Sequence, residues 1–219
     1  MTVAHTFLFA DLAGYTALTE AHGDARAAEL AADFFSCVRS LLEEHSAHEV
    51  KTIGDAVMLR CERPSEAVGL GLAIVAAVDA EEWFPPVRVG MSTGEAIDRD
   101  EDWFGSTVNL AARISGAAGG GEVLLSDATR EAAGEVDGIE FHRHGEVELR
   151  NVPQPVTLYR AVRAGERREN LPVDPVCRMM IAPEASAGEV IYEGVEYRFC
   201  SLQCVGEFAR APDRYHPLG

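Results

Sequence analysis

Residues 7–16 read FLFADLAGYT, and this stretch predicts the first strand of a sheet followed by a tight turn. Its first four residues are apolar, which is typical of a short buried strand. Asp11 ends that strand, and Gly14 permits the chain to turn sharply. An aspartate in this place more often caps a turn, but it also stands where a carboxylate can leave the sheet edge and meet a ligand.

Helical and strand-like patterns alternate along the chain after this turn. Apolar residues recur at helical spacing over 24–44, and Pro64 opens a second helical stretch at 65–78. The order strand, helix, hairpin, helix, strand predicts an α/β (α+β) fold of the ferredoxin-like βαββαβ type with extra elements attached. The expected strands after the first are 49–53, 56–59, 87–94, 122–125, 145–149 and 156–162, and a further helix starts near 107 and continues to 114.

Composition predicts an ordinary globular protein. The 219 residues are 47% hydrophobic and 25% charged, and the formal net charge is −17. This charge repels phosphate backbones, so we expect no nucleic-acid partner. The longest apolar stretch, 68–78, is too short to span a bilayer and no signal-peptide pattern opens the sequence, so we expect a cytoplasmic protein without a membrane partner. Five cysteines in such a chain argue against a disulfide framework.

A second aspartate accompanies the first. Asp55 stands at the tip of the hairpin predicted around Gly54, and Asp11 ends the first strand. Two carboxylates on adjacent strands can hold two divalent cations about 3.5–4 Å apart, an arrangement that serves phosphoryl chemistry. Backbone N–H groups for phosphate oxygens are offered beside such cations by Leu12, Ala13, Gly14, Tyr15 and Thr16.

Other polar residues suit a nucleotide. Lys51 is the single lysine among 19 basic residues, and it lies on the strand just before Asp55. Residues 102–113 read DWFGSTVNLAAR and place Asn109 and Arg113 four apart on one helical face. An amide and a guanidinium so placed can position a ribose and grip a phosphate, although such a pair taken alone is common on surface helices.

Residues 7–16, 51–55 and 102–113 together resemble the three signature stretches of class III adenylyl/guanylyl cyclase catalytic domains. They occur in that family's order, and the resemblance extends over about residues 3–163. It implies two Mg²⁺ or Mn²⁺ ions per site, held by Asp11, Asp55 and the Leu12 carbonyl. It implies that Lys51 and Asp102 read adenine, Asn109 orients the ribose, Arg113 stabilises transition-state charge and Arg150 binds the triphosphate. The family has a lysine at the last of these positions, so Arg150 departs from its pattern.

The resemblance also implies the reaction. Such an enzyme converts ATP to cyclic AMP and pyrophosphate at a homodimer interface, with metal carboxylates from one protomer and base-reading residues from the other. Lys51 offers a donor and Asp102 an acceptor, which matches adenine and not guanine, so we expect ATP as the substrate. The alternative is a catalytically inactive cyclase-like scaffold that binds nucleotide and carries a heavy-metal sensor.

The C-terminal residues form a second unit. Periodicity is lost over 164–171, which we interpret as a linker between a domain at 1–163 and a small α+β module at 172–219. Cys177, Cys200 and Cys204 follow a C-x22-C-x3-C pattern, and three thiolates suit Zn²⁺ or Cu(I). A fourth ligand would be His216, Asp174 or none, and the same cysteines are also compatible with a small core that holds no metal.

Three stretches of this module, 173–179, 197–204 and 208–215, resemble the YHS domain. That family is related to the TRASH-type metal-binding modules, so the resemblance implies metal binding without naming the metal. Because the module follows the cyclase-like domain directly, we expect metal binding to regulate the cyclase, through the late strands near Arg150. An independent metal store or a docking surface is the alternative.

Overall fold

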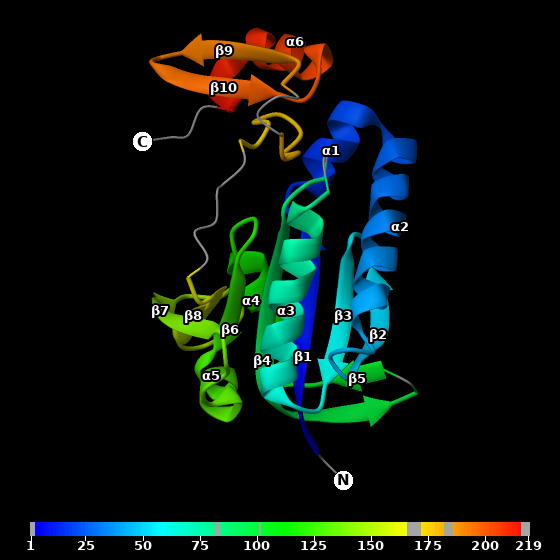
Figure 1. The fold of residues 1–219 in the computed structure, drawn as a ribbon, viewed down its shortest axis with the longest axis vertical. Coiled ribbons are helices and arrows are strands. Elements are labelled where there is room, and N and C mark those ends of the chain that lie inside the picture. The colour runs from blue at the N-terminus through cyan, green and yellow to red at the C-terminus, as the bar shows by residue number, and fades with distance from the viewer. Residues whose placement is uncertain (1–2, 82–83, 101, 166–171, 182–185, 216–219) are drawn as a thin grey trace.

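The computed structural model describes residues 3–81, 84–100, 102–165, 172–181 and 186–215. A large mixed sheet forms its centre (Figure 1) and comprises β1 (Val3–Leu12), β2 (Ala47–Ile53), β3 (Ala56–Cys61), β4 (Val87–Arg99), β5 (Asp102–Phe104), β6 (Val123–Ser126), β7 (Ile139–Val147) and β8 (Val156–Arg163). The strand order is β2-β3-β1-β4-β6-β8-β7, and β5 pairs with the end of β4. Among the described pairings of this sheet, β4 with β6 is parallel and the rest are antiparallel.

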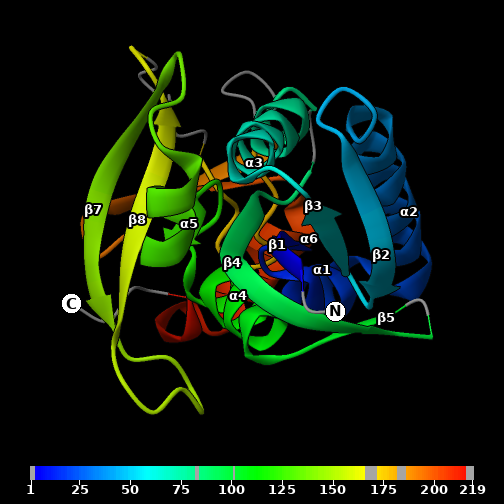
Figure 2. The same cartoon turned by 90° about the horizontal axis from the view of Figure 1, so that it is seen from below.

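Helices cover both faces of the sheet (Figure 2). They are α1 (Tyr15–His22), α2 (Asp24–Leu41), α3 (Pro64–Asp79), α4 (Ser106–Ala117) and α5 (Asp127–Ala133). Side chains of β1 alternate between the two faces: Leu8 packs in the cluster that contains α2 and α3, whereas Phe7 and Phe9 pack with α4. Helix α4 comes so close to β4 that a Cβ on Gly90 would lie 1.9 Å from the backbone nitrogen of Ser115, so glycine is required there.

The α/β fold expected from the sequence is confirmed. The hairpin around Gly54-Asp55 and the three longer helices lie where the periodicity predicts them. Strand β7 covers Ile139–Val147, so it begins before the expected strand at 145–149 and overlaps it only in part. The other elements that the sequence did not predict are short: α1 has 8 residues, α5 has 7 and β5 has 3. Such segments hold too few residues for a period to stand out, and β5 exists as a partner for the end of β4.

The C-terminal segment folds onto one end of the sheet, beside α1 (Figure 1). It contains β9 (Gly188–Tyr192), β10 (Val195–Phe199), α6 (Leu202–Arg210) and the 3₁₀ helix η2 (Pro212–Arg214). A hairpin turn at Glu193-Gly194 joins β9 and β10, with φ of 49° and 80° at the two residues. Residues 166–171 of the expected linker lie outside the described residues.

The core of this segment is continuous with that of the larger part. Phe208 of α6 is buried against Phe199 and Tyr197 of β10, and these rings join the same hydrophobic cluster as α2 and α3. A backbone hydrogen bond from Met180 to the carbonyl of Phe84 (2.9 Å) links the two parts directly. Within the described ranges, no helix has both the length and the apolar composition needed to cross a bilayer.

Candidate active site and metal centre

The two aspartates expected to bind metal lie side by side. Asp11 is the last residue but one of β1 and lies opposite Ala56 of β3, which puts Asp55, in the β2–β3 turn, next to it. Burial, together with the interaction with the neighbouring Asp11 carboxyl group and its negative charge, raises the pKa of Asp55 to about 7. Two acidic groups this close in a half-buried place favour the binding of cations.

Arg88 of β4 already supplies one positive charge. It lies opposite Asp11 in the β1–β4 register, and its Nε and Nη2 atoms donate to Asp11 Oδ2 at 2.8 and 2.5 Å. Sequence reasoning missed this residue, because its place beside Asp11 depends on which strands pair. Hard carboxylate oxygens are the donors that Mg²⁺ and Mn²⁺ prefer, so the Asp11–Asp55 pair fits the expected divalent ions.

The turn after Asp11 leads directly into α1. Leu12 is the last residue of β1 and pairs with Val87, and the backbone N–H of Ala13 donates to Pro86 (2.8 Å). Because the Ala13 N–H is used in this bond, it is not available as one of the expected phosphate donors. Gly14 adopts φ of 91° at the N-terminus of α1. The first-turn N–H groups of a helix, here those of Tyr15 and Thr16, have no partner within it, so they remain suited to an anion.

Lys51 and Asp102, which are far apart in sequence, form an ion pair. Lys51 Nζ of β2 lies 2.5 Å from Asp102 Oδ2 of β5, and the bond from Lys51 lowers the pKa of Asp102. The other carboxylate oxygen accepts from the backbone N–H of Trp103 at 2.8 Å. Lys51 Nζ also lies 5.8 Å from the centre of the Phe104 ring. The pair therefore presents a donor and an acceptor next to an exposed aromatic face.

The remaining predicted residues line a cavity between α4 and the β7–β8 loop. Asn109 and Arg113 face it from α4, and Arg150 with Asn151 closes it from the loop. Arg150 precedes Asn151, which has a positive φ of 62°. The structure thus brings Arg150 to the two residues with which it is expected to act.

The predicted residues form three separate groups within one chain. The first group is Asp11 with Asp55, which the unpredicted Arg88 joins, the second is Lys51 with Asp102, and the third is the α4 cavity. No hydrogen bond or ion pair among the described residues joins one group to another.

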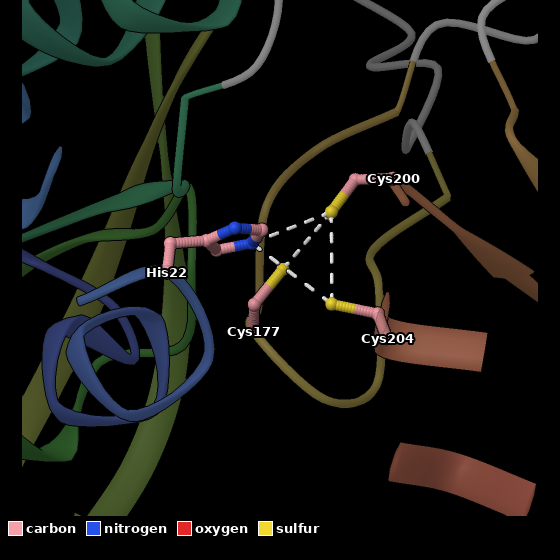
Figure 3. Close-up of side chains that lie close together, drawn as sticks. All are labelled: His22, Cys177, Cys200 and Cys204. Carbon is pink, nitrogen blue, oxygen red and sulfur yellow. Dashed lines mark hydrogen bonds between the residues drawn. The ribbon is translucent and has the colours of Figure 1, made fainter. Parts of the chain in front are cut away.

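The three C-terminal cysteines converge (Figure 3). Cys177 lies in the loop before β9, Cys200 follows β10 and Cys204 is in the first turn of α6. The Sγ of Cys200 lies 3.4 Å from that of Cys177 and 3.8 Å from that of Cys204, and all three thiols are free. Donation from the Cys177 and Cys200 thiols lowers the pKa of Cys204, whereas the Cys200 partner and burial raise that of Cys177.

A histidine from the other part of the chain completes this cluster. His22 ends α1, and its Nε2 lies 3.6 Å from Cys200 Sγ and 3.9 Å from Cys204 Sγ. The four ligand atoms of His22, Cys177, Cys200 and Cys204 all lie within 4.8 Å of one another. Sequence reasoning missed His22 because nothing local distinguishes it, and it is 155 residues from Cys177 in the chain.

Asp174, one expected fourth ligand, has a different position. It is fully buried, and its carboxylate accepts the backbone N–H groups of Val176 (2.8 Å), Cys177 (3.3 Å) and Cys200 (2.8 Å). It therefore fixes the backbone beneath two of the cysteines. His216, the other expected ligand, lies outside the described residues.

Comparisons with known proteins find one family match for the larger part of the chain and another for its C-terminal segment. The family model of the adenylate and guanylate cyclase catalytic domain matches residues 2–161, and the YHS domain model matches residues 173–218. Both expected family resemblances are confirmed.

Named relatives are adenylate cyclases. A pH-sensitive adenylate cyclase of Mycobacterium tuberculosis is 39% identical over 165 residues, which cover 74% of this chain and 41% of that protein. An adenylate cyclase of Streptomyces griseus is 34% identical over 138 residues, which cover 63% and 33%. The chain thus spans less than half the length of these two relatives.

Solved structures show the same fold. Adenylate cyclases of Trypanosoma brucei, solved in their monomeric state, superpose with a TM-score of 0.69 at 27% identity, covering 75% of this chain and 90% of that one. The adenylyl cyclase CyaB of P. aeruginosa gives 0.66 at 23% identity, covering 78% and 98%.

Proposed function

Because the chain belongs to the adenylate and guanylate cyclase catalytic-domain family, with a YHS domain after it, we propose that it is an adenylyl cyclase that converts ATP to cyclic AMP and pyrophosphate. The observation that carries this proposal is the Asp11–Asp55 pair at the ends of adjacent strands. The pair would hold the two divalent ions, with the Leu12 carbonyl beside them. When bound, such ions acidify the attacking 3′-hydroxyl and neutralise the charge on the α-phosphate.

The chain's own residues would supply the rest of the reaction. The N-terminus of α1, at Tyr15 and Thr16, offers N–H groups to phosphate oxygens. Arg113 would stabilise the charge that develops on the α-phosphate, and Asn109 would orient the ribose for in-line attack. Arg150 lines the same cavity and would contact the triphosphate.

ATP is favoured over GTP by the polarity of the Lys51–Asp102 pair. Adenine presents an acceptor ring nitrogen and an exocyclic amino donor, which match Lys51 and Asp102 respectively. Guanine reverses this pattern and would leave the Lys51 ammonium facing a donor and the Asp102 carboxylate facing an acceptor.

A homodimer would bring the three groups of residues together around shared sites. Three apolar side chains near the Lys51–Asp102 pair are at least half exposed: Ile53 (50%), Ile97 (60%) and Phe104 (50%). A second copy of the chain would cover them, because exposed apolar groups gathered on one face favour association. The base-reading residues of one protomer would then meet the metal-binding carboxylates of its partner.

The C-terminal residues would form a metal-binding domain that regulates the cyclase. We assign residues 1–163 to the catalytic domain, 164–171 to a linker and 172–219 to the YHS domain. Cys177, Cys200 and Cys204 would hold a soft or borderline ion, Zn²⁺ or Cu(I).

The test is cyclic nucleotide production by the purified chain with Mg²⁺ or Mn²⁺ and either ATP or GTP. Cyclic AMP from ATP, with little cyclic GMP from GTP, is expected. Tight ATP binding without any product would instead identify an inactive nucleotide-binding scaffold, and equal turnover of GTP would contradict the assigned base readers.

A further inference from the structure

We propose that His22 is the fourth ligand of a zinc ion held by Cys177, Cys200 and Cys204, so that the metal fastens the C-terminal domain to helix α1 of the catalytic domain (Figure 3). The proposal rests on the metal binding proposed for the cysteines, and it adds the ligand, the metal and the connection between domains.

The distances fit a tetrahedral zinc site. With Zn–S of about 2.3 Å and Zn–N of about 2.0 Å, a regular tetrahedron sets sulfur atoms about 3.8 Å apart and the nitrogen about 3.5 Å from each sulfur. The structure gives 3.4 and 3.8 Å between sulfurs. The imidazole nitrogen lies 3.6 and 3.9 Å from two of them. A disulfide would require about 2.05 Å, so the cysteines are placed as separate ligands.

Ligand type and burial favour zinc over Cu(I). Three thiolates and one imidazole form a closed four-ligand set that is typical of structural zinc, whereas softer ligand sets suit Cu(I). Cys177 and Cys204 are fully buried, and Cys200 nearly so. Asp174 and the Ser201 cap, which accepts from the backbone N–H of Cys204 at 3.2 Å, fix the three cysteine-bearing segments before any ion arrives.

Contacts between the C-terminal domain and α1 place His22 next to the three cysteines. Gln203 of α6 donates its Nε2 to the carbonyl of Ala21 (2.6 Å), one of the last carbonyls of α1, which have no partner within the helix. Arg214 approaches Glu20 at 3.5 Å. An ion with ligands on both sides would strengthen this junction further.

Helix α1 connects the proposed metal site to the residues proposed for catalysis. His22 is the last residue of this helix, and Gly14, next to the first, belongs to the turn after Asp11. A helix of 8 residues has little independent stability, so a ligand bond at one end restricts the other end too.

Zinc titration of the full chain against a competing chelator tests the proposal, with Co²⁺ as a spectroscopic probe. We expect one Zn²⁺ per chain, tetrahedral Co²⁺ bands and thiolate charge transfer. His22→Ala should weaken Zn²⁺ binding by about tenfold or more and alter the Co²⁺ bands. His144→Ala, which removes an exposed histidine of β7, should change neither.

Hydrogen exchange of α1 provides the readout of the connection. Zn²⁺ should slow exchange over residues 15–22 in the wild type and in His144→Ala, but not in His22→Ala. A His22→Ala protein with wild-type Zn²⁺ affinity and Co²⁺ spectrum would overturn the proposal, as would unchanged exchange in the wild type. Neither measurement requires nucleotide, so loss of the proposed cyclase activity would leave this result standing, and an active cyclase without zinc would refute only this inference.

Discussion

The side chain of Arg178 lies directly against Gly14, so that a Cβ on Gly14 would come within 2.4 Å of Arg178 Cγ. Arg178 follows Cys177, is solvent-exposed and has a positive φ of 67°. Gly14 opens α1 in the turn that begins at Asp11. The YHS domain thus packs the aliphatic part of an arginine side chain against the turn expected to bind the triphosphate, in a chain whose net charge is −17.

Arg178→Ala should raise the KM for MgATP by about three- to tenfold, equivalent to ~1 kcal/mol, with a smaller change in kcat. The reason is that a cation beside the phosphate-binding turn attracts the triphosphate before and during the reaction. Steady-state kinetics measure the effect. Arg178→Lys should recover part of it, and Arg210→Ala, an exposed arginine of α6, should match the wild type. An unchanged KM in Arg178→Ala would remove this residue from the site.

Asp11→Ala and Asp55→Ala should each reduce cyclic AMP formation by at least about 10²-fold, because each removes a ligand of the divalent ions. Thermal unfolding and the oligomeric state should remain close to the wild type, since these carboxyl groups lie at one end of β1 and β3, are only partly buried and do not belong to the hydrophobic core. Substantial activity in either variant, with Mg²⁺ or with Mn²⁺, would contradict the two-metal assignment.

Activity should return when inactive Asp55→Ala protein is mixed with inactive Arg113→Ala protein. In the mixed dimer, one of the two sites would combine an intact metal-binding half with an intact α4 cavity. Cyclic AMP formation after verified subunit exchange measures this recovery, which is at most about half of the wild-type activity per mixed dimer. No recovery would show that each chain carries complete sites.

The stability of the metal-free protein should fall as pH rises from about 4 to about 7. The pKa of Asp55 is raised from 3.8 to about 7, so the folded protein binds more protons than the unfolded chain between these values. The stabilisation is therefore complete below pH 4 and is lost as pH rises through 7. Because the group is half-buried, we expect roughly 1–2 kcal/mol.

Urea unfolding in a chelating buffer at pH 5 and pH 7.5 measures this slope. Asp55→Asn cannot ionise and should lack it, whereas Asp137→Asn, which changes an exposed aspartate, should keep it. Equal slopes in wild type and Asp55→Asn would mean that another group controls the dependence.

Sequence patterns predicted the parts of the site that depend on local order. Asp11 after a buried strand and Asp55 in a hairpin turn could be placed before the strands were paired, because each position follows from its neighbours. Arg88 and His22 could not. Arg88 meets Asp11 through the β1–β4 register, and His22 meets the cysteines through the docking of a second domain. Site residues that no local sequence pattern marks can be identified only from the tertiary structure, which brings them together.

The expected route of regulation also changes with the structure. The sequence suggested that the module would act through the late strands near Arg150. The hydrogen bonds and ion pair between the two parts run instead through the end of α1 and the segment before β4, at Ala21, Glu20 and Phe84. The loop of Phe84 also holds Ala13, because the neighbouring Pro86 carbonyl accepts the Ala13 N–H.

Metal at the cysteines should therefore change cyclase activity through the Asp11 turn. With catalytic Mg²⁺ saturating, we expect the activity of the wild type to vary with free Zn²⁺ and that of Cys200→Ser/Cys204→Ser to remain constant. Cys37→Ser, which alters a thiol outside the cluster, should respond like the wild type. Linkage requires that ATP change the Zn²⁺ affinity by the same factor by which Zn²⁺ changes the ATP affinity, and calorimetry can measure both. Identical responses in wild type and the double variant would show that the cluster does not regulate the cyclase, and a response to Cu(I) alone would replace zinc as the regulatory ion.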